Sequence, residues 1–224
     1  YKHNAGQETR IDPSVSNIVD IYLLERTYDN LFRIWSQDGG VKPLTSTADQ
    51  LRINYAGTLN SLKSLSDQIV YHPVKYKILF GANADEQLQA TFKVVKNTKT
   101  NVTDAVIKTR VIAAVNEFFA LDNWDFGDTF YFTELAAYVH NQLAPDLLTA
   151  VIVPNQAGQG FGSLFQINSA SDEIFISGAT VDDVSIISAL GANQLAASGT
   201  VVTATSTATT NTTTGSSVSG STTT

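Results

Sequence analysis

The chain has 224 residues, an apolar content of 43% and a formal net charge of −7, so it carries enough apolar material for one large core or two small ones. The acidic balance disfavours a nucleic-acid partner, and no apolar run reaches the ~20 residues of a membrane helix. Cysteine is absent, which excludes disulfides and thiolate chemistry. Methionine is absent too, and the sequence starts at Tyr1, so we expect part of a longer protein.

Residues 1–70 are predicted to be a region of long helices with interchain helix packing. Asp12-Pro13 is a typical helix start. Beyond it, apolar side chains recur at alternating spacings of three and four, namely at Ile21, Leu24, Tyr28, Leu31 and Trp35. An ordinary core helix and a helix shared with another chain both remain open. A second helix is expected over 48–65.

Residues 71–197 are predicted to form a mixed α/β domain with short antiparallel strands. The expected elements, in chain order, are a strand over 74–80 with 91–95 as its partner, helices over 102–121 and 133–143, a buried strand over 147–153, a hairpin of 164–167 with 173–176, and a short helix capped at Thr180 and running to Leu190. Strands and helices mix without a strict βαβ order, so the fold class is predicted to be α+β.

Residues 198–224 form a Thr/Ser-rich tail without charged or aromatic side chains. Such a composition buries too little surface to offset its own ordering entropy. Its threonines and Val201-Val202 favour an extended strand. We therefore expect this tail to lie along a sheet edge, on a neighbouring molecule for example, with an accidental contact as the alternative.

The segment 121–135 gathers the main acidic cluster of the chain, comprising Asp122, Asp125, Asp128 and Glu134. Paired carboxylates can cleave glycosides when they lie about 5–9 Å apart in a cleft. The spacing does not match a calcium loop, and Asp in turns commonly bonds its own backbone. We favour this structural role, and the scattered histidines supply no metal-binding motif. No catalytic residue, metal site or cofactor is therefore predicted.

Five aromatic side chains crowd the same segment and cannot all enter one small core. Large aromatics contribute strongly to protein interfaces. Trp124 and Phe126 are therefore added to the candidate interface residues of the N-terminal stripe.

Three segments carry a family resemblance: Arg10–Tyr22 with its Asp-Pro-Ser-Val-Ser-Asn-Ile run, Tyr76–Gly81, and Trp124–Leu135. Over residues 1–197 the chain resembles the C-terminal part of the gene-product-six baseplate wedge proteins of T-even-like contractile-tailed phages, which are similar to baseplate J proteins. The tail after Ser198 is not covered by this resemblance.

The resemblance implies a non-enzymatic, structural virion protein of the tail baseplate, assembled in the host cytoplasm. Family members occur as paired copies in each wedge, contact other wedge proteins and form a ring around the hub. The expected partners are thus a second copy of the chain and other wedge proteins. The alternative is a carbohydrate- or receptor-binding, or glycan-cleaving, tail module that uses the Trp124–Glu134 region.

Overall fold

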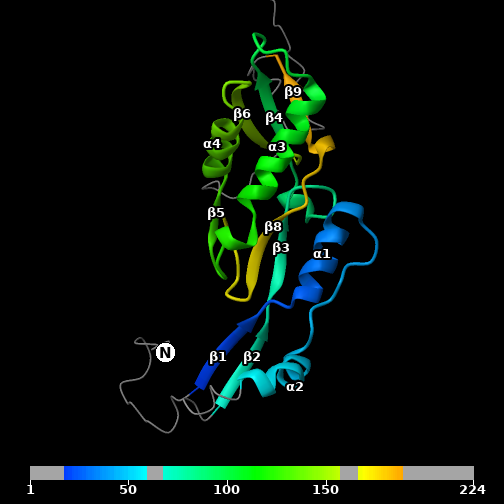
Figure 1. The fold of residues 1–224 in the computed structure, drawn as a ribbon, viewed down its shortest axis with the longest axis vertical. Coiled ribbons are helices and arrows are strands. Elements are labelled where there is room, and N and C mark those ends of the chain that lie inside the picture. Colours follow the sequence, from blue (N-terminus) through cyan, green and yellow to red (C-terminus); the bar gives the residue numbers. More distant parts are fainter. Residues whose placement is uncertain (1–17, 60–67, 157–165, 189–224) are drawn as a thin grey trace, which may run out of the picture.

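The computed structural model describes residues 18–59, 68–156 and 166–188. Within them the chain forms an α+β arrangement of short helices and several small sheets (Figure 1). The helices are α1 Arg26–Asp38, α2 Ala48–Leu59, α3 Asp104–Phe118 and α4 Phe132–Leu143. The strands are β1 Ile18–Leu23, β2 Gln68–Pro73, β3 Lys75–Leu79, β4 Ala90–Lys96, β5 Thr129–Tyr131, β6 Leu147–Pro154, β7 Gln166–Asn168, β8 Glu173–Ser177 and β9 Val184–Ile187.

Most of the buried side chains belong to what we call the body, residues 75–156 and 166–188. Its three-stranded sheet has the order β6-β4-β9, and α3 and α4 pack together and against this sheet. In α3 the buried residues Ile107, Val111, Ala114 and Val115 recur at helical spacing, and the Thr103 side chain caps the helix by accepting from the Val106 N–H. The aromatic ring of Phe80 is fully buried at the centre of the core.

The other end of the molecule is a slender projection, which we call the arm and define as β1, α2 and β2 (Figure 1). β1 and β2 form a two-stranded parallel ladder that pairs Ile18 with Gln68 and Leu23 with Pro73. α2 packs against β2. Within the arm, Leu51 and Tyr71 are the buried side chains among the residues that the structure describes.

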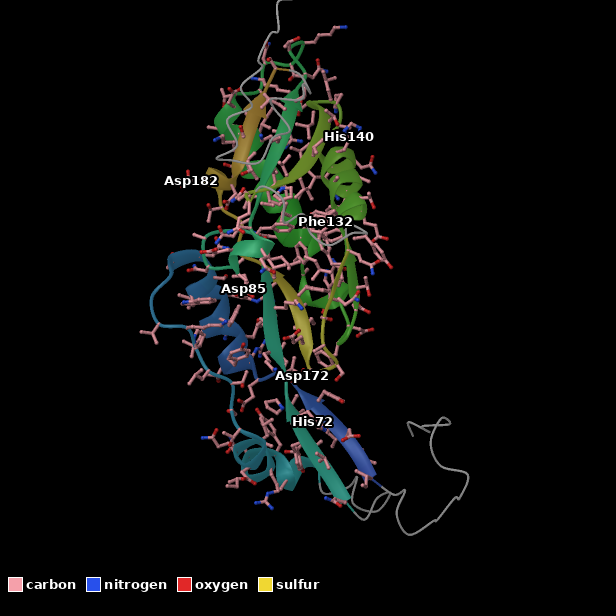
Figure 2. All side chains as sticks on the ribbon, turned by 180° about the vertical axis from the view of Figure 1, so that it is seen from behind. His72, Asp85, Phe132, His140, Asp172 and Asp182 are labelled. Atoms are coloured by element: carbon pink, nitrogen blue, oxygen red, sulfur yellow. The ribbon has the colours of Figure 1, made fainter. Side chains whose placement is uncertain are left out.

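The arm joins the body where β2 continues almost directly into β3. The Val74 N–H donates to the Leu23 carbonyl at 2.9 Å, whereas the next N–H, that of Lys75, donates to the Asp172 carbonyl at 3.0 Å. Successive N–H groups of a strand point to opposite edges. β1 and β8 therefore lie on opposite edges of one long strand, which changes partner at Val74. Figure 2 shows Asp172 at this junction.

Helix α1 covers the edge of β3 that β8 leaves open. The hydroxyl of Tyr28 accepts a hydrogen bond from the Tyr76 N–H at 3.3 Å. Tyr28, Phe32 and Trp35 form one stripe of α1 and are buried against residues of β3 and β8. These three side chains of α1 are thus covered within the chain.

The prediction of long N-terminal helices is wrong. Residues 18–23 form strand β1, and α1 begins only at Arg26. The segment Ile-Val-Asp-Ile-Tyr-Leu is rich in β-branched and aromatic residues, and its parallel partner β2 lies about 45 residues further along the chain, so the strand preference prevails over the helical spacing. α2 ends at Leu59, and 60–67 lie outside the described residues. The predicted boundary at residue 70 falls inside β2.

The helices predicted over 102–121 and 133–143 are confirmed as α3 and α4, and the strands over 74–80 and 147–153 as β3 and β6. The predicted pairing of the strand 74–80 with 91–95 is wrong. β3 pairs in parallel with β8, while β4 pairs antiparallel with β6 and parallel with β9. The expected hairpin is absent from the described residues, because β7 pairs with β5. Three of the five ladders that the described residues form are parallel, so the prediction of antiparallel strands is wrong for most of the strand pairs.

Within the described residues, the helix predicted from Thr180 to Leu190 is a 3-10 turn over Val181–Asp183, and 189–190 lie outside them. Thr180 does cap it, with the Asp183 carboxylate accepting from the Thr180 N–H at 2.8 Å. The chain then enters β9, where Val184, Ile186 and Ile187 are strand formers that pair with β4. The tail predicted over 198–224 lies outside the described residues.

Candidate interaction surfaces

Helix α1 and the loop that follows it expose large apolar side chains. Leu31 and Ile34 on the outer face of α1 are 52% and 59% exposed, and Val41 and Leu44 in the loop are 94% and 90% exposed. They surround a hollow of about 510 Å³ whose floor includes Trp35 and Pro43. We call this set of Leu31, Ile34, Val41 and Leu44 the α1 surface.

The loop that completes the α1 surface is held in place by backbone and ring contacts. Gly39, at φ +73°, ends the helix and donates its N–H to the Trp35 carbonyl at 2.8 Å. The Trp35 indole N–H donates to the Gly40 carbonyl at 3.3 Å. The Lys42 ammonium lies 5.4 Å from the centre of the Trp35 ring, a cation–π distance. These contacts fix the backbone of the loop that carries the exposed Val41 and Leu44.

The residues of the predicted N-terminal interface stripe differ in how far they are buried. Tyr28 and Trp35 are buried in the chain's own core, at 6% and 9% exposure. Ile21 is half-buried on β1, and Leu24 packs against the core formed by α1, β3 and β8. Leu31 is the member that faces outward. Sequence reasoning missed Ile34, Val41 and Leu44, although two apolar residues flanking Pro43 in a loop were an available signal.

Trp124 is half-buried and packs against the core. Its ring stacks on Phe119 at 5.5 Å with an interplanar angle of 12° and meets Phe175 edge-on at 5.1 Å. Its indole N–H donates to the Phe118 carbonyl at 2.9 Å. Both the ring and the polar atom of Trp124 are therefore engaged within the body.

Phe126 lies on the other side of the same loop and is 40% exposed. Its ring centre is 6.3 Å from that of Tyr22 on β1. Tyr22 in turn stacks on His72 at 4.8 Å, and His72 contacts Asp20 at 2.8 Å. Phe126 therefore links the body to the arm.

The acidic residues of the same segment serve the turn. The Asp128 carboxylate accepts from the Asp125 N–H at 2.7 Å, and Gly127 adopts φ +81°. Asp122, Asp125 and Glu134 point to an exposed surface. No group of three His, Cys, Asp or Glu side chains suited to a metal ion occurs among residues 18–59, 68–156 and 166–188. His72 on the arm and His140 on α4 lie far apart (Figure 2).

A second hollow, of about 230 Å³, lies where α1, α3 and β8 meet. We call it the Arg33 pocket; its lining consists of Arg33, Ser36, Gln37, Asn116, Phe119, Ile176 and Ser177. Sequence reasoning missed it. Arg33, Ser36 and Gln37 share one face of α1, but Asn116 and Ser177 come from distant segments that only the tertiary structure brings together.

The guanidinium of Arg33 is fixed from one side by its neighbours. Its Nε donates to the Asp29 carboxylate at 2.6 Å, and its Nη2 donates to the Tyr76 hydroxyl at 3.3 Å. The same Asp29 oxygen accepts from the Tyr76 hydroxyl at 2.5 Å. Burial, and then the hydrogen bond to Asp29, raise the pKa of Tyr76 above its ordinary value of 10.0. Tyr76 therefore remains a neutral donor at physiological pH.

Comparison with protein-family models gives no match for this chain, and comparison with curated proteins gives no significant relative. The resemblance to baseplate wedge proteins therefore rests on the three segments quoted for it. Among the described helices, none has the length and apolar character needed to cross a membrane.

Proposed function

We propose that this chain is a structural subunit of a contractile-tail baseplate wedge that associates with a second copy of itself and with neighbouring wedge proteins. The observation that carries the proposal is the α1 surface. Four large apolar side chains gather around one hollow there, and two of them are at least 90% exposed. Scattered apolar residues are ordinary on a protein surface, but a contiguous set marks an interaction site.

The arm supports the same proposal. A two-stranded ladder is at best marginally stable by itself, and parallel ladders are normally covered on both faces. Ile18 at the start of β1 is 48% exposed, and the burial of the β1 side chains is at most partial. An assembly that covers the arm and the α1 surface would therefore stabilise the parts of the chain that its own core covers least.

The arrangement in paired copies around a hub, the contacts with other wedge proteins and the virion location belong to this proposal and follow from the resemblance. The role is mechanical and uses no reaction or cofactor. The alternative of a glycan-binding or glycan-cleaving module has less support, because Trp124 is half-buried against the core of the body with its indole N–H bonded to the Phe118 carbonyl, and the Asp128 carboxylate is bonded within its own turn.

The test is the molar mass of the purified chain in solution, measured by light scattering across a concentration series. We expect a dimer or larger species at about 100 μM, which is well above a micromolar Kd. The variant Val41→Asp/Leu44→Asp should be monomeric, because a charge at each exposed tip cannot be buried without a partner.

The matched control is Val106→Asp/Leu148→Asp, which places the same charges at exposed apolar positions of α3 and β6, at 47% and 56% exposure. This control should keep the wild-type mass. Circular dichroism checks that all three proteins are folded. A monomeric wild type at the highest concentration, or an unchanged mass in Val41→Asp/Leu44→Asp, would contradict self-association through the α1 surface.

A further inference from the structure

The Arg33 pocket concentrates hydrogen-bond donors that the chain itself leaves unused. Nη1 of Arg33 forms no hydrogen bond within the described part of the chain, and neither do the side-chain amides of Gln37 and Asn116. Ser177 is only 4% exposed; its hydroxyl oxygen accepts from the Ala179 N–H at 3.1 Å, which leaves the O–H free to donate. One positive charge and several neutral donors thus converge on one small space.

The carboxylate next to the pocket is already occupied. Asp29, the nearest carboxylate to Arg33, lies on the Nε side and is shared between Arg33 and Tyr76. The Ser36 hydroxyl donates to the Arg33 carbonyl at 2.8 Å. The pocket lining itself contains no acidic side chain. The side-chain acceptors of the lining are neutral, the amide oxygens of Gln37 and Asn116 among them, and a carboxylate is a charged acceptor that matches the open side of a guanidinium beside amide donors.

The size and floor of the pocket restrict the ligand further. Its volume of about 230 Å³ falls below the roughly 300–1,000 Å³ of ordinary small-molecule sites. Phe119 and Ile176 supply an apolar floor, which suits a short hydrocarbon stem. A single carboxylate-bearing residue fits these limits, whereas a nucleotide or cofactor is too large.

We propose that the Arg33 pocket binds the carboxylate of one residue presented by a partner protein, either an acidic side chain or a C-terminal carboxylate. The carrier of that residue follows from the proposed function, since a subunit of an assembly meets other chains. The pocket chemistry does not depend on that function. The two oxygens would receive hydrogen bonds from Arg33 and the nearby amides, and the stem would lie on Phe119.

The experiment titrates the folded chain with three small probes and follows the backbone and side-chain amide signals around the pocket by ¹H–¹⁵N NMR. The backbone signals report binding also in variants that lack the Gln37 and Asn116 side chains. The probes are N-acetyl-glutamate methylamide for a side-chain carboxylate, N-acetyl-alanine for a C-terminal carboxylate, and N-acetyl-glutamine methylamide as the neutral isostere. We expect a carboxylate probe to shift the Gln37 and Asn116 signals and to bind about tenfold more tightly than the isostere, which equals about 1.4 kcal/mol. The tighter of the two carboxylates identifies the source.

The variant Gln37→Ala/Asn116→Ala removes two exposed donors without touching the core and should weaken the carboxylate probe at least several-fold. Asn141→Ala, at an exposed position of α4, is the matched control and should bind like the wild type. Equal binding of carboxylate and isostere, shifts confined to other regions, or no shift at all would overturn the proposal. Because the probes bind a single chain, this outcome is independent of the molar-mass test of self-association.

Discussion

The body and the arm contain the same kinds of residue but bury very different numbers of side chains. In the body, two helices cover a three-stranded sheet, and Phe80, Phe92, Phe119 and Phe130 form an interlocked ring cluster at 0–2% exposure. In the arm, twelve strand residues provide one buried side chain, Tyr71. A parallel pair of strands that is not covered on both faces is marginally stable by itself, so it depends on packing against neighbouring elements.

The largest expected effect comes from removing the centre of the body. Phe80 is fully buried and packs edge-on against four other phenylalanine rings. Phe80→Ala should lower the free energy of unfolding by about 3–5 kcal/mol, because it deletes a large core side chain and leaves a cavity. Equilibrium urea unfolding measures this change.

The matched substitution in the arm is Leu51→Ala, at the fully buried side chain of α2. If the arm is a separate unit, this variant should speed amide exchange in β2 while the main urea transition moves by less than about 1 kcal/mol. A loss of 3 kcal/mol or more in that transition would show that arm and body unfold together.

A pair of glycines gives the next contrast. Gly81 in the body has φ +72°, and an added Cβ would lie 1.9 Å from the Gly178 carbonyl oxygen. Gly81→Ala should therefore destabilise by about 2 kcal/mol or more. Gly57 in α2 has open space around it, so Gly57→Ala should stabilise the helix by about 0.5–1 kcal/mol. Thermal unfolding of both variants checks the opposite signs.

The contact between α1 and β3 tests how α1 is held on the body. Tyr28→Phe removes the hydroxyl that accepts from the Tyr76 N–H and leaves that buried donor without a partner. The expected cost is about 1–2 kcal/mol. Tyr138→Phe, at a half-buried tyrosine of α4, should change the stability by less than about 0.5 kcal/mol. Equal values for the two variants would mean that the edge donor is satisfied by water.

The smallest expected effect is a loss of stability at alkaline pH that comes from two tyrosines. Burial raises the pKa of Tyr28, and burial with the Asp29 hydrogen bond raises that of Tyr76, above 10.0. The folded state thus holds these protons more tightly than the unfolded state. Their contribution is full below about pH 10 and is lost as the pH rises through the folded pKa values. Urea unfolding from pH 8 to pH 11 should show this decline, and Tyr76→Phe should reduce its slope.

Local pattern was sufficient for the elements with one dominant period. α3 has a capping threonine and apolar residues at helical spacing, and β3 alternates, so both were predictable. The segment 18–23 was not, because its spacing fits a helix and its residue types favour a strand. Pairing decided the outcome there, and the partner of β1 lies beyond α1 and α2.

The candidate surfaces likewise depend on tertiary packing more than on local sequence pattern. Leu31 was predicted on the same stripe as Tyr28 and Trp35, but the buried stripe of α1 runs through Phe32, so that Tyr28 and Trp35 are buried and Leu31 is exposed. Trp124 was expected at an interface because five crowded aromatic side chains could not all enter one small core, yet its ring contacts those of Phe118, Phe119, Phe130 and Phe175. The Arg33 pocket depends on segments about 80 and 140 residues apart in the sequence, a proximity that no local pattern encodes.

The change of partner at Val74 has a mechanical consequence. β1 pairs with one edge of the long β2–β3 strand and β8 pairs with the opposite edge, and both pairings are parallel. Tension along the arm is then directed along the strand axis, across hydrogen bonds that stand perpendicular or slanted to the pull. These bonds are loaded in shear and share the force, whereas bonds opened like a zipper would bear it one at a time. The geometry of the junction therefore resists separation when the two ends of the molecule are pulled apart.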